Sequence, residues 1–270
     1  MKKLSLAAAL TTALTGVAAG WSPAAMAQSS AAAASPFTFT GNLTLASQYR
    51  YRGIEQTAGR PAVQGGFDLA HESGLYVGTW ASNVSWLSDL GAQNSSLEWD
   101  FYGGFKKTFG DLGFDVGGLY YYYPGRFGRD TNYGALGFRE PNTFELYAGV
   151  SWKMLSLKYS HAMTRLFGIP DSEGAGYLDL TGNFDVGNGF TVVAHVGHQR
   201  IPASPTLNYT RGDLSYTDWR LGVTKELVGL TFGLAYVDTN AKAGTGAFYR
   251  SLQNRDVGKG AVVATIGKTF

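Results

Sequence analysis

The segment from Phe37 to Tyr51 reads FTFTGNLTLASQYRY and alternates between two kinds of side chain. One set of alternate positions is apolar, small or aromatic and comprises Phe37, Phe39, Gly41, Leu43, Leu45, Ser47, Tyr49 and Tyr51. The intervening set is mostly polar and comprises Thr38, Thr40, Asn42, Thr44, Ala46, Gln48, Arg50 and Arg52. A period of two indicates a β-strand with one apolar and one polar face. A sheet that is apolar outside and polar inside suits a closed barrel in lipid.

Similar segments recur up to Phe270, and they predict twelve strands in all. Their approximate ranges are 37–51, 62–70, 75–86, 96–109, 113–123, 143–152, 155–166, 176–186, 190–200, 216–226, 230–240 and 258–270. Long connections alternate with short ones such as His71–Gly74 and Gly187–Gly189. An even strand number with short turns at one end and long loops at the other is typical of outer-membrane barrels. The sequence therefore predicts an all-β, 12-stranded antiparallel transmembrane β-barrel with short periplasmic turns and long extracellular loops.

The N-terminal residues 1–27 are expected to be a cleaved signal peptide. Lys2 and Lys3 precede an apolar stretch, and Ala25-Met26-Ala27 forms a small-x-small cleavage site. Residues 28–36 are rich in Ala and Ser and are expected to be a disordered lead-in, so the barrel domain is 37–270. The remaining sequence has no apolar run of about 18 residues, the length that a membrane-spanning helix requires. These features predict export to the cell outer membrane of a Gram-negative bacterium.

Charge and composition exclude several classes of function. Removal of the leader would leave 20 basic and 20 acidic residues, and a formal charge of zero gives no reason to expect a nucleic-acid partner. The chain has no cysteine, so it has neither disulfides nor thiolate chemistry. No phosphate-binding loop or dinucleotide motif is present, and we expect no cofactor.

Aromatic residues of the outward set fall near the ends of the expected strands, where ring edges would meet lipid head groups. Toward the long loops these are Tyr49, Tyr51, Trp99, Tyr120, Tyr122, Phe144, Trp219 and Tyr236. Toward the short turns they are Phe37, Phe39, Phe105, Phe109, Phe114, Trp152, Phe184, Phe190, Phe232 and Phe270. Strand 75–86 is ambiguous, because Trp80 and Leu75 have opposite parity and either face could point outward.

Several motifs resemble those of the TorF family of porins. They include LASQYRYRGIEQT at 45–57, PAVQGGFD at 61–68, GTWASNVS at 78–85, EWDFYGG at 98–104 and the closing KTF at 268–270. The resemblance covers nearly the whole chain after the leader and implies an outer-membrane protein of channel type. It assigns no functional residues. The terminal Phe270 is also similar to the signal that the barrel-assembly machinery reads, although Lys268 departs from the usual apolar alternation of that signal.

The polar face of the strands predicts a narrow, charged lumen, since twelve strands enclose less space than the sixteen of a general porin. The inward charges expected near the long loops are Arg50, Arg52, Glu98, Asp100, Glu145, Asp179, Asp218 and Arg220. Opposed acids and bases at a constriction would select solutes by charge. The sequence thus predicts a passive channel for small hydrophilic solutes. Acids outnumber bases on the inward face, which predicts a mild preference for cations.

Two alternatives stay open at this point. The inward charges could pair with one another and plug the lumen, which would leave a closed structural or surface barrel. The long loop 124–142 could fold inward, although we expect it to lie in solvent.

A third alternative, a lipid-modifying hydrolase, would need a serine, a histidine and an orienting partner together. Ser160 and His161 are adjacent in a strand and therefore face opposite sides of the sheet, which does not favour a hydrolase site. His195 and His198 are three residues apart and also face opposite sides, which does not favour a metal pair. We therefore expect no enzyme activity. Outer-membrane lipids are the expected partners of the barrel, and the sequence does not indicate an oligomeric state.

Overall fold

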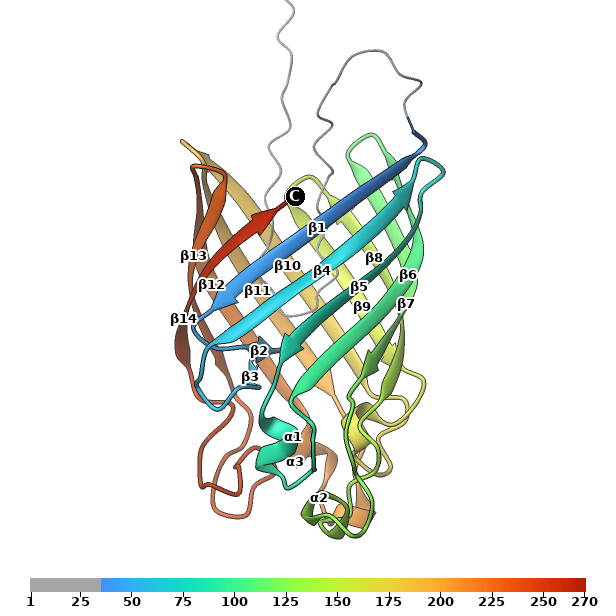
Figure 1. Ribbon diagram of the computed structural model, residues 1–270, viewed down its shortest axis with the longest axis vertical. Helices are drawn as coiled ribbons and strands as arrows, with labels where there is room; N and C mark the ends of the chain where they lie inside the picture. The colour runs from blue at the N-terminus through green and yellow to red at the C-terminus, as the bar shows by residue number, and fades with distance from the viewer. Residues whose placement is uncertain (1–34) are drawn as a thin grey trace, which may run out of the picture.

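The computed structural model describes residues 35–270, so the predicted signal peptide and nearly all of the predicted lead-in 28–36 lie outside the described residues. Twelve antiparallel strands close into one barrel (Figure 1). They are β1 (Phe37–Ala46), β4 (Ala62–His71), β5 (Leu75–Asn83), β6 (Leu97–Phe109), β7 (Leu112–Tyr122), β8 (Thr143–Trp152), β9 (Leu155–Ala162), β10 (Gly176–Gly187), β11 (Phe190–Arg200), β12 (Tyr216–Leu227), β13 (Leu230–Thr239) and β14 (Ala261–Thr269). The predicted fold class is confirmed.

The first and last strands close the barrel. In the β1–β14 pairing Asn42 lies opposite Thr269 and Ala46 lies opposite Thr265. Beyond the named strand, the backbones of Gly41 and Phe270 exchange hydrogen bonds of 3.2 and 2.8 Å. Closure leaves no unpaired sheet edge, so every barrel strand has hydrogen-bonding neighbours on both sides.

The two ends of the barrel differ, as the loop lengths predict. We call the end with the short connections the turn end and the other the loop end (Figure 1). The loop end carries the short helices α1 (Trp86–Asp89), α2 (Asn132–Ala135), α3 (Arg211–Leu214), η1 (Leu166–Gly168) and η2 (Pro205–Leu207). Within residues 35–270, none of the helices has the length and apolar character needed to cross a membrane.

The first strand ends earlier than its alternation predicts. It stops at Ala46 rather than at residue 51, and the chain then folds back through the two short strands β2 (Arg50–Tyr51) and β3 (Ile54–Glu55). Tyr49 and Tyr51 are only 1% and 6% exposed, so the prediction that they face outward is wrong. Their hydroxyl groups find hydrogen-bond partners inside the barrel, which a period of two cannot reveal. We call residues 47–61 the inner hairpin.

The outer surface is apolar along the barrel. Apart from Tyr49 and Tyr51, all the aromatic residues predicted to face outward near the strand ends are exposed. The ambiguous strand β5 places Leu75 and Val77 outward and Trp80 inward. This strand ends at Asn83 instead of 86, because the chain enters α1 three residues later.

Tyrosine rings on the inner face lie over glycines of the neighbouring strand. Tyr76 is paired with Gly104, Tyr102 with Gly78, and Tyr147 with Gly117. A Cβ atom added at any of these glycines would collide with the tyrosine beside it. The glycines therefore let the rings lie close to the wall and leave room in the middle of the barrel.

Candidate functional site

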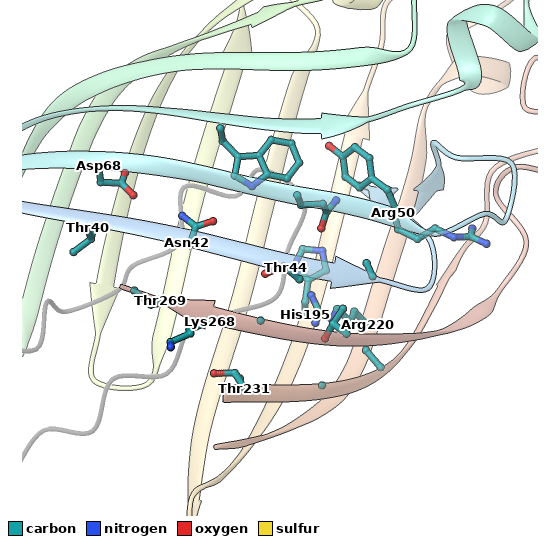
Figure 2. Close-up of a pocket in the computed structure, with 18 of the residues that line it drawn as sticks. Thr40, Asn42, Thr44, Arg50, Asp68, His195, Arg220, Thr231, Lys268 and Thr269 are labelled. Atoms are coloured by element: carbon teal, nitrogen blue, oxygen red, sulfur yellow. The ribbon is translucent and has the colours of Figure 1, made fainter. Parts of the chain in front are cut away.

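A cavity of about 1200 Å³ lies inside the barrel and reaches from the turn end to the inner hairpin. At the turn end it is bordered by Gly74, Gly229 and Phe270. Along β1 it is bordered by threonine and asparagine side chains, and Figure 2 shows Thr40 and Asn42 near Asp68 of β4 at this wall. The wall offers hydroxyl, amide and charged groups to its contents, which suits water and hydrophilic solutes.

Acidic side chains at this wall accept hydrogen bonds from tyrosine hydroxyl groups. The pairs are Tyr102–Asp68 at 2.6 Å, Tyr76–Asp115 at 2.7 Å and Tyr177–Asp218 at 2.9 Å. A hydrogen bond to a carboxylate is stronger than one between neutral groups, and it fixes both side chains. These tyrosines thus hold the acids against the wall.

The inner hairpin enters the lumen at the loop end of the cavity. Arg50 pairs with Glu55 and Tyr51 with Ile54, so Arg52 and Gly53 form a two-residue turn. Both turn residues have positive φ, 46° and 80°, which is the type I′ geometry that glycine favours at the second position. A Cβ atom at Gly53 would lie 2.7 Å from the Asp218 Cβ atom and would also collide with Thr239. The tip of the hairpin therefore presses directly against the wall formed by β12 and β13.

Arg52, at this tip, bridges two separate strands of the wall. Its Nη2 donates to Glu145 Oε2 of β8 at 2.7 Å, and its Nη1 donates to Gln199 Oε1 of β11 at 2.7 Å. The guanidinium group lies 4.3 Å from the ring centroid of Tyr177. The Arg52 and Glu145 side chains are 7% and 2% exposed, so the ion pair is withdrawn from water. We call Arg52, Glu145 and Gln199 the latch.

Tyrosines fix the rest of the hairpin to the wall of the barrel. The Tyr49 hydroxyl donates to Glu98 Oε1 at 2.6 Å, and the Tyr51 hydroxyl lies 2.9 Å from that of Tyr121. On the wall, Tyr123 donates to the other oxygen of Glu98. Each buried hydroxyl thereby has a hydrogen-bond partner, which offsets its loss of contact with water.

Arg50 borders the large cavity and also fixes the inner hairpin. Its Nη1 donates to the carbonyl oxygens of Gly53 at 3.2 Å, Val257 at 3.3 Å and Lys259 at 3.0 Å. It therefore ties the inner hairpin to the loop between β13 and β14. Figure 2 shows its side chain directed away from Asp68 and Asn42.

Aromatic rings from the loops cover the hairpin. Phe167, in η1, has a φ of 49° and places its ring within 5.3 Å of the Tyr51 ring and 5.2 Å of the Tyr121 ring, measured between centroids. The strained backbone of Phe167 is held by this packing. Tyr133 of α2 is fully buried, so the expectation that loop 124–142 lies in solvent is wrong for this residue. We call Phe167, Tyr51, Tyr121, Tyr123 and Trp86 the seal.

A second cavity of about 170 Å³ lies on the loop side of the hairpin. It shares no lining residue with the first cavity. Arg52 and Tyr121 border the first cavity, whereas Gln199 and Tyr51, their hydrogen-bond partners, border the second. The latch and the seal thus separate the two spaces.

A family model places this chain among known proteins. The model of the family described as "Bacterial protein of unknown function (Gcw_chp)" matches residues 30–270. The chain belongs to the Gcw_chp family. No curated protein matches it. The more specific resemblance to the TorF family of porins stays a prediction.

Solved structures similar to this Gcw_chp chain include outer-membrane channels. A KdgM porin superposes with a TM-score of 0.51 and 6% identity over 86% of this chain and 98% of the porin. An outer membrane channel from Pseudomonas putida F1 superposes with a TM-score of 0.50 and 12% identity over 86% of this chain and 95% of the channel. At such identities the similarity shows a shared fold.

Histidine chemistry in this Gcw_chp chain centres on His195, which lies between two aspartates. Its Nε2 is 2.9 Å from Asp218 Oδ2 and its Nδ1 is 3.4 Å from Asp179 Oδ2. This group ties β10, β11 and β12 together. In the described part of the chain, none of the four histidines contacts both a serine and a carboxylate, and no cluster of metal-ligating side chains occurs.

The structure places the predicted lumen charges in two groups. Those that border the large cavity are Arg50, Arg52, Asp179, Asp218 and Arg220. Glu98, Asp100 and Glu145 do not border it and are at most 1% exposed. These acids face inward as their parity predicts, but the hairpin and the tyrosines cover them. Whether the eight residues determine selectivity stays a prediction.

Sequence reasoning missed the partners of the latch and the seal. Gln199 and Tyr121 lie on the inward face of their strands, but the sequence does not show that a loop reaches them. The Arg52-Gly53 dipeptide is the one local signal, because an X-Gly pair between short alternating segments is compatible with a tight hairpin. Phe167 lies in a loop and has no periodicity that could reveal its position.

Proposed function

We propose that this protein is an outer-membrane channel that lets small hydrophilic solutes diffuse passively. The observation that carries the proposal is the polar cavity of about 1200 Å³ within a closed twelve-stranded barrel. In the described conformation the inner hairpin closes the loop end of this cavity. Conduction therefore requires that the hairpin leave its seat, at least transiently, and the latch sets how often this happens.

The outer surface supports a location in the outer membrane. Exposed aromatic side chains lie near both ends of the strands, and exposed Leu, Val and Phe side chains lie between them. A barrel with all its strands paired satisfies its backbone hydrogen bonds without water, as hydrocarbon requires. We further propose that Phe270, which is exposed at the end of the last strand, is read by the barrel-assembly machinery.

The predicted mild preference for cations rests on the larger number of acids on the inward face of the strands. The residues that border the large cavity are nearly balanced, with five Asp or Glu and six Lys or Arg. The acids Glu98 and Asp100, although covered, lie on the inward face together with Asp68 and Asp115. Asp68 and Asp115 border the large cavity and act on its contents directly, whereas Glu98 and Asp100 do not border it. Glu145 contributes less, since Arg52 neutralises it.

One observation favours a second candidate function. The seal and the latch lie between two cavities that share no lining residue, and Arg52, Tyr51 and Tyr121 are buried there. If the hairpin never leaves, the protein is a closed surface or structural barrel whose loops carry the function.

Single-channel recording of the full, refolded protein in a planar bilayer distinguishes the two functions. A channel gives discrete conductance steps, and in a salt gradient its reversal potential has the sign of cation preference. A folded, heat-modifiable protein without steps would establish the closed barrel. Conductance steps with a reversal potential of the opposite sign would contradict the cation preference, but the proposal of a channel would stand.

A further inference from the structure

The cavity of about 170 Å³ on the loop side of the hairpin has mainly aromatic and aliphatic walls. The aromatic side chains come from separate parts of the chain and include Tyr51, Trp86, Phe138, Phe167 and Phe248. Ile54, Leu90 and Ile201 fill the spaces between them. A pocket of this composition offers ring faces and edges to an apolar occupant.

The size of the cavity fits an occupant of about one ring. An engineered apolar cavity of about 150 Å³ in another protein binds benzene. The present cavity is slightly larger, at about 170 Å³. It therefore accommodates a single six-membered ring with one small substituent.

The charged residues at this cavity favour a neutral occupant. Glu55 and Asp89 both lie near the Arg255 guanidinium group, at 3.6 and 3.7 Å. Arg250 supplies a second cation among the lining residues, so two acids face two bases. Tyr249 contributes no charge, because burial raises the pKa of its hydroxyl group, which donates to the carbonyl oxygen of Leu214.

Two buried donors at the cavity indicate one polar substituent on the occupant. Trp86 Nε1 and Arg250 Nε are buried and have no hydrogen-bond partner, and both residues line the cavity. A buried N–H group without a partner costs about 1–3 kcal/mol. An acceptor oxygen on the occupant would remove this cost at either donor.

We propose that this cavity is a binding site for a neutral, single-ring aromatic molecule with one oxygen substituent, the chemistry of phenol. Tyr51, Ile54, Glu55 and Gln56 supply one wall, and all four belong to the inner hairpin. The site is therefore complete only when the hairpin is seated. Because a ligand stabilises the state that binds it, the occupant would keep the hairpin in place. This last consequence rests on the proposed channel function, whereas binding itself does not.

Titration calorimetry of the full, refolded protein with phenol, in detergent and against a detergent blank, tests the site. We expect saturable binding to one site. Trp86→Phe keeps one ring but removes the N–H group together with part of the indole, so we expect phenol to lose about five- to tenfold in affinity from the hydrogen bond, in addition to any loss of ring contact. Toluene has the ring without the oxygen, so its change in affinity measures the lost ring contact alone, and phenol should lose about five- to tenfold more than toluene.

Trp80→Phe is the matched control, because Trp80 lines the large cavity and not this one. Phenol affinity that is unchanged in Trp80→Phe and reduced in Trp86→Phe supports the site. No saturable binding to the wild type, or an equal loss in both variants, overturns it. Binding without conductance would contradict the channel alone, and conductance without binding would contradict the site alone.

Discussion

Arg52 holds the inner hairpin against the wall of the lumen, because it joins this loop to two strands of the barrel. Its guanidinium group uses separate nitrogens for Glu145 and Gln199 and lies against two tyrosine rings. The planar fork of arginine fits such a position, and lysine could not make both hydrogen bonds in the same way. The sequence predicts that Arg52 faces the lumen, but the distance it spans follows from the hairpin.

Removal of Arg52 should unseat the hairpin. Arg52→Ala leaves Glu145 buried without its cation, which costs about 3–5 kcal/mol in comparable pairs. We expect a clear rise in open probability in single-channel recordings. The double variant Arg52→Ala/Glu145→Gln leaves no buried charge. Its loss of unfolding free energy should therefore be smaller than the sum of the losses in the two single variants. Arg126→Ala breaks an exposed ion pair with Asp130 and should change nothing. Additive effects in the cycle would contradict the latch.

Gly53 provides a second test of the seat with a close control. Gly53→Ala adds a Cβ atom that collides with Thr239 and Asp218, in a backbone with a φ of 80°. Gly59→Ala, in the same loop, has a φ of 70° and no atom within 4 Å of the added Cβ. Both variants place alanine in a backbone with positive φ, which is unfavourable to the same degree. Only in Gly53→Ala does the added Cβ atom collide with neighbouring atoms. We expect higher open probability only in Gly53→Ala, and equal behaviour of the two would show that the tip does not press on the wall.

At the scale of elements, strand alternation predicts the barrel strands well because lipid-facing and lumen-facing environments differ so strongly. It fails at the end of β1, where the chain stays alternating but leaves the sheet. Tyr49 and Tyr51 have the parity of lipid-facing residues, yet their hydroxyl groups bond to Glu98 and Tyr121 inside. The helices of the loops are only three or four residues long, too short for a period of 3.6 to appear in the sequence.

The His195 group should stabilise three strands together. His195→Ala would leave Asp179 and Asp218 facing each other without their shared partner, and we expect a loss of about 3–5 kcal/mol in unfolding free energy. His198 lies on the same strand, is exposed on the outer face and shares a hydrogen bond of 3.0 Å with Thr217. His198→Ala should stay within about 0.5 kcal/mol of the wild type. Urea titration of the folded band on a gel measures both, and equal midpoints would contradict this role.

For the whole molecule, the apolar outer surface should matter only where it meets lipid. Leu221, in the middle of β12, and Leu252, in the loop after β13, are 62% and 59% exposed. Leu221→Lys should cost about 2–4 kcal/mol when the protein folds into vesicles, the cost of lysine at the bilayer centre. Leu252→Lys should cost almost nothing. If both variants fold equally well, the barrel does not span the membrane as proposed.

Closure of the barrel is the feature of the whole molecule that can be predicted most directly from the sequence. Whether the lumen is open or blocked is the feature that can be predicted least. Strand number, order and the pairing of the first strand with the last all agree with the alternation and the loop lengths. Whether the lumen is open depends on the contacts of Arg52 with Glu145 and Gln199. These residues lie 93 and 147 positions after Arg52 in the chain. No local pattern encodes such contacts.

The most direct test replaces the inner hairpin and records conductance. Ala46 and Ala62 are register partners in β1 and β4, so residues 47–61 can be exchanged for Asn-Gly without a change of register. In planar bilayers we expect the wild type to open rarely and the shortened protein to conduct in long, stable steps. A shortened protein that folds, shows the heat-modifiable band and yet does not conduct would contradict a channel closed by its own first loop.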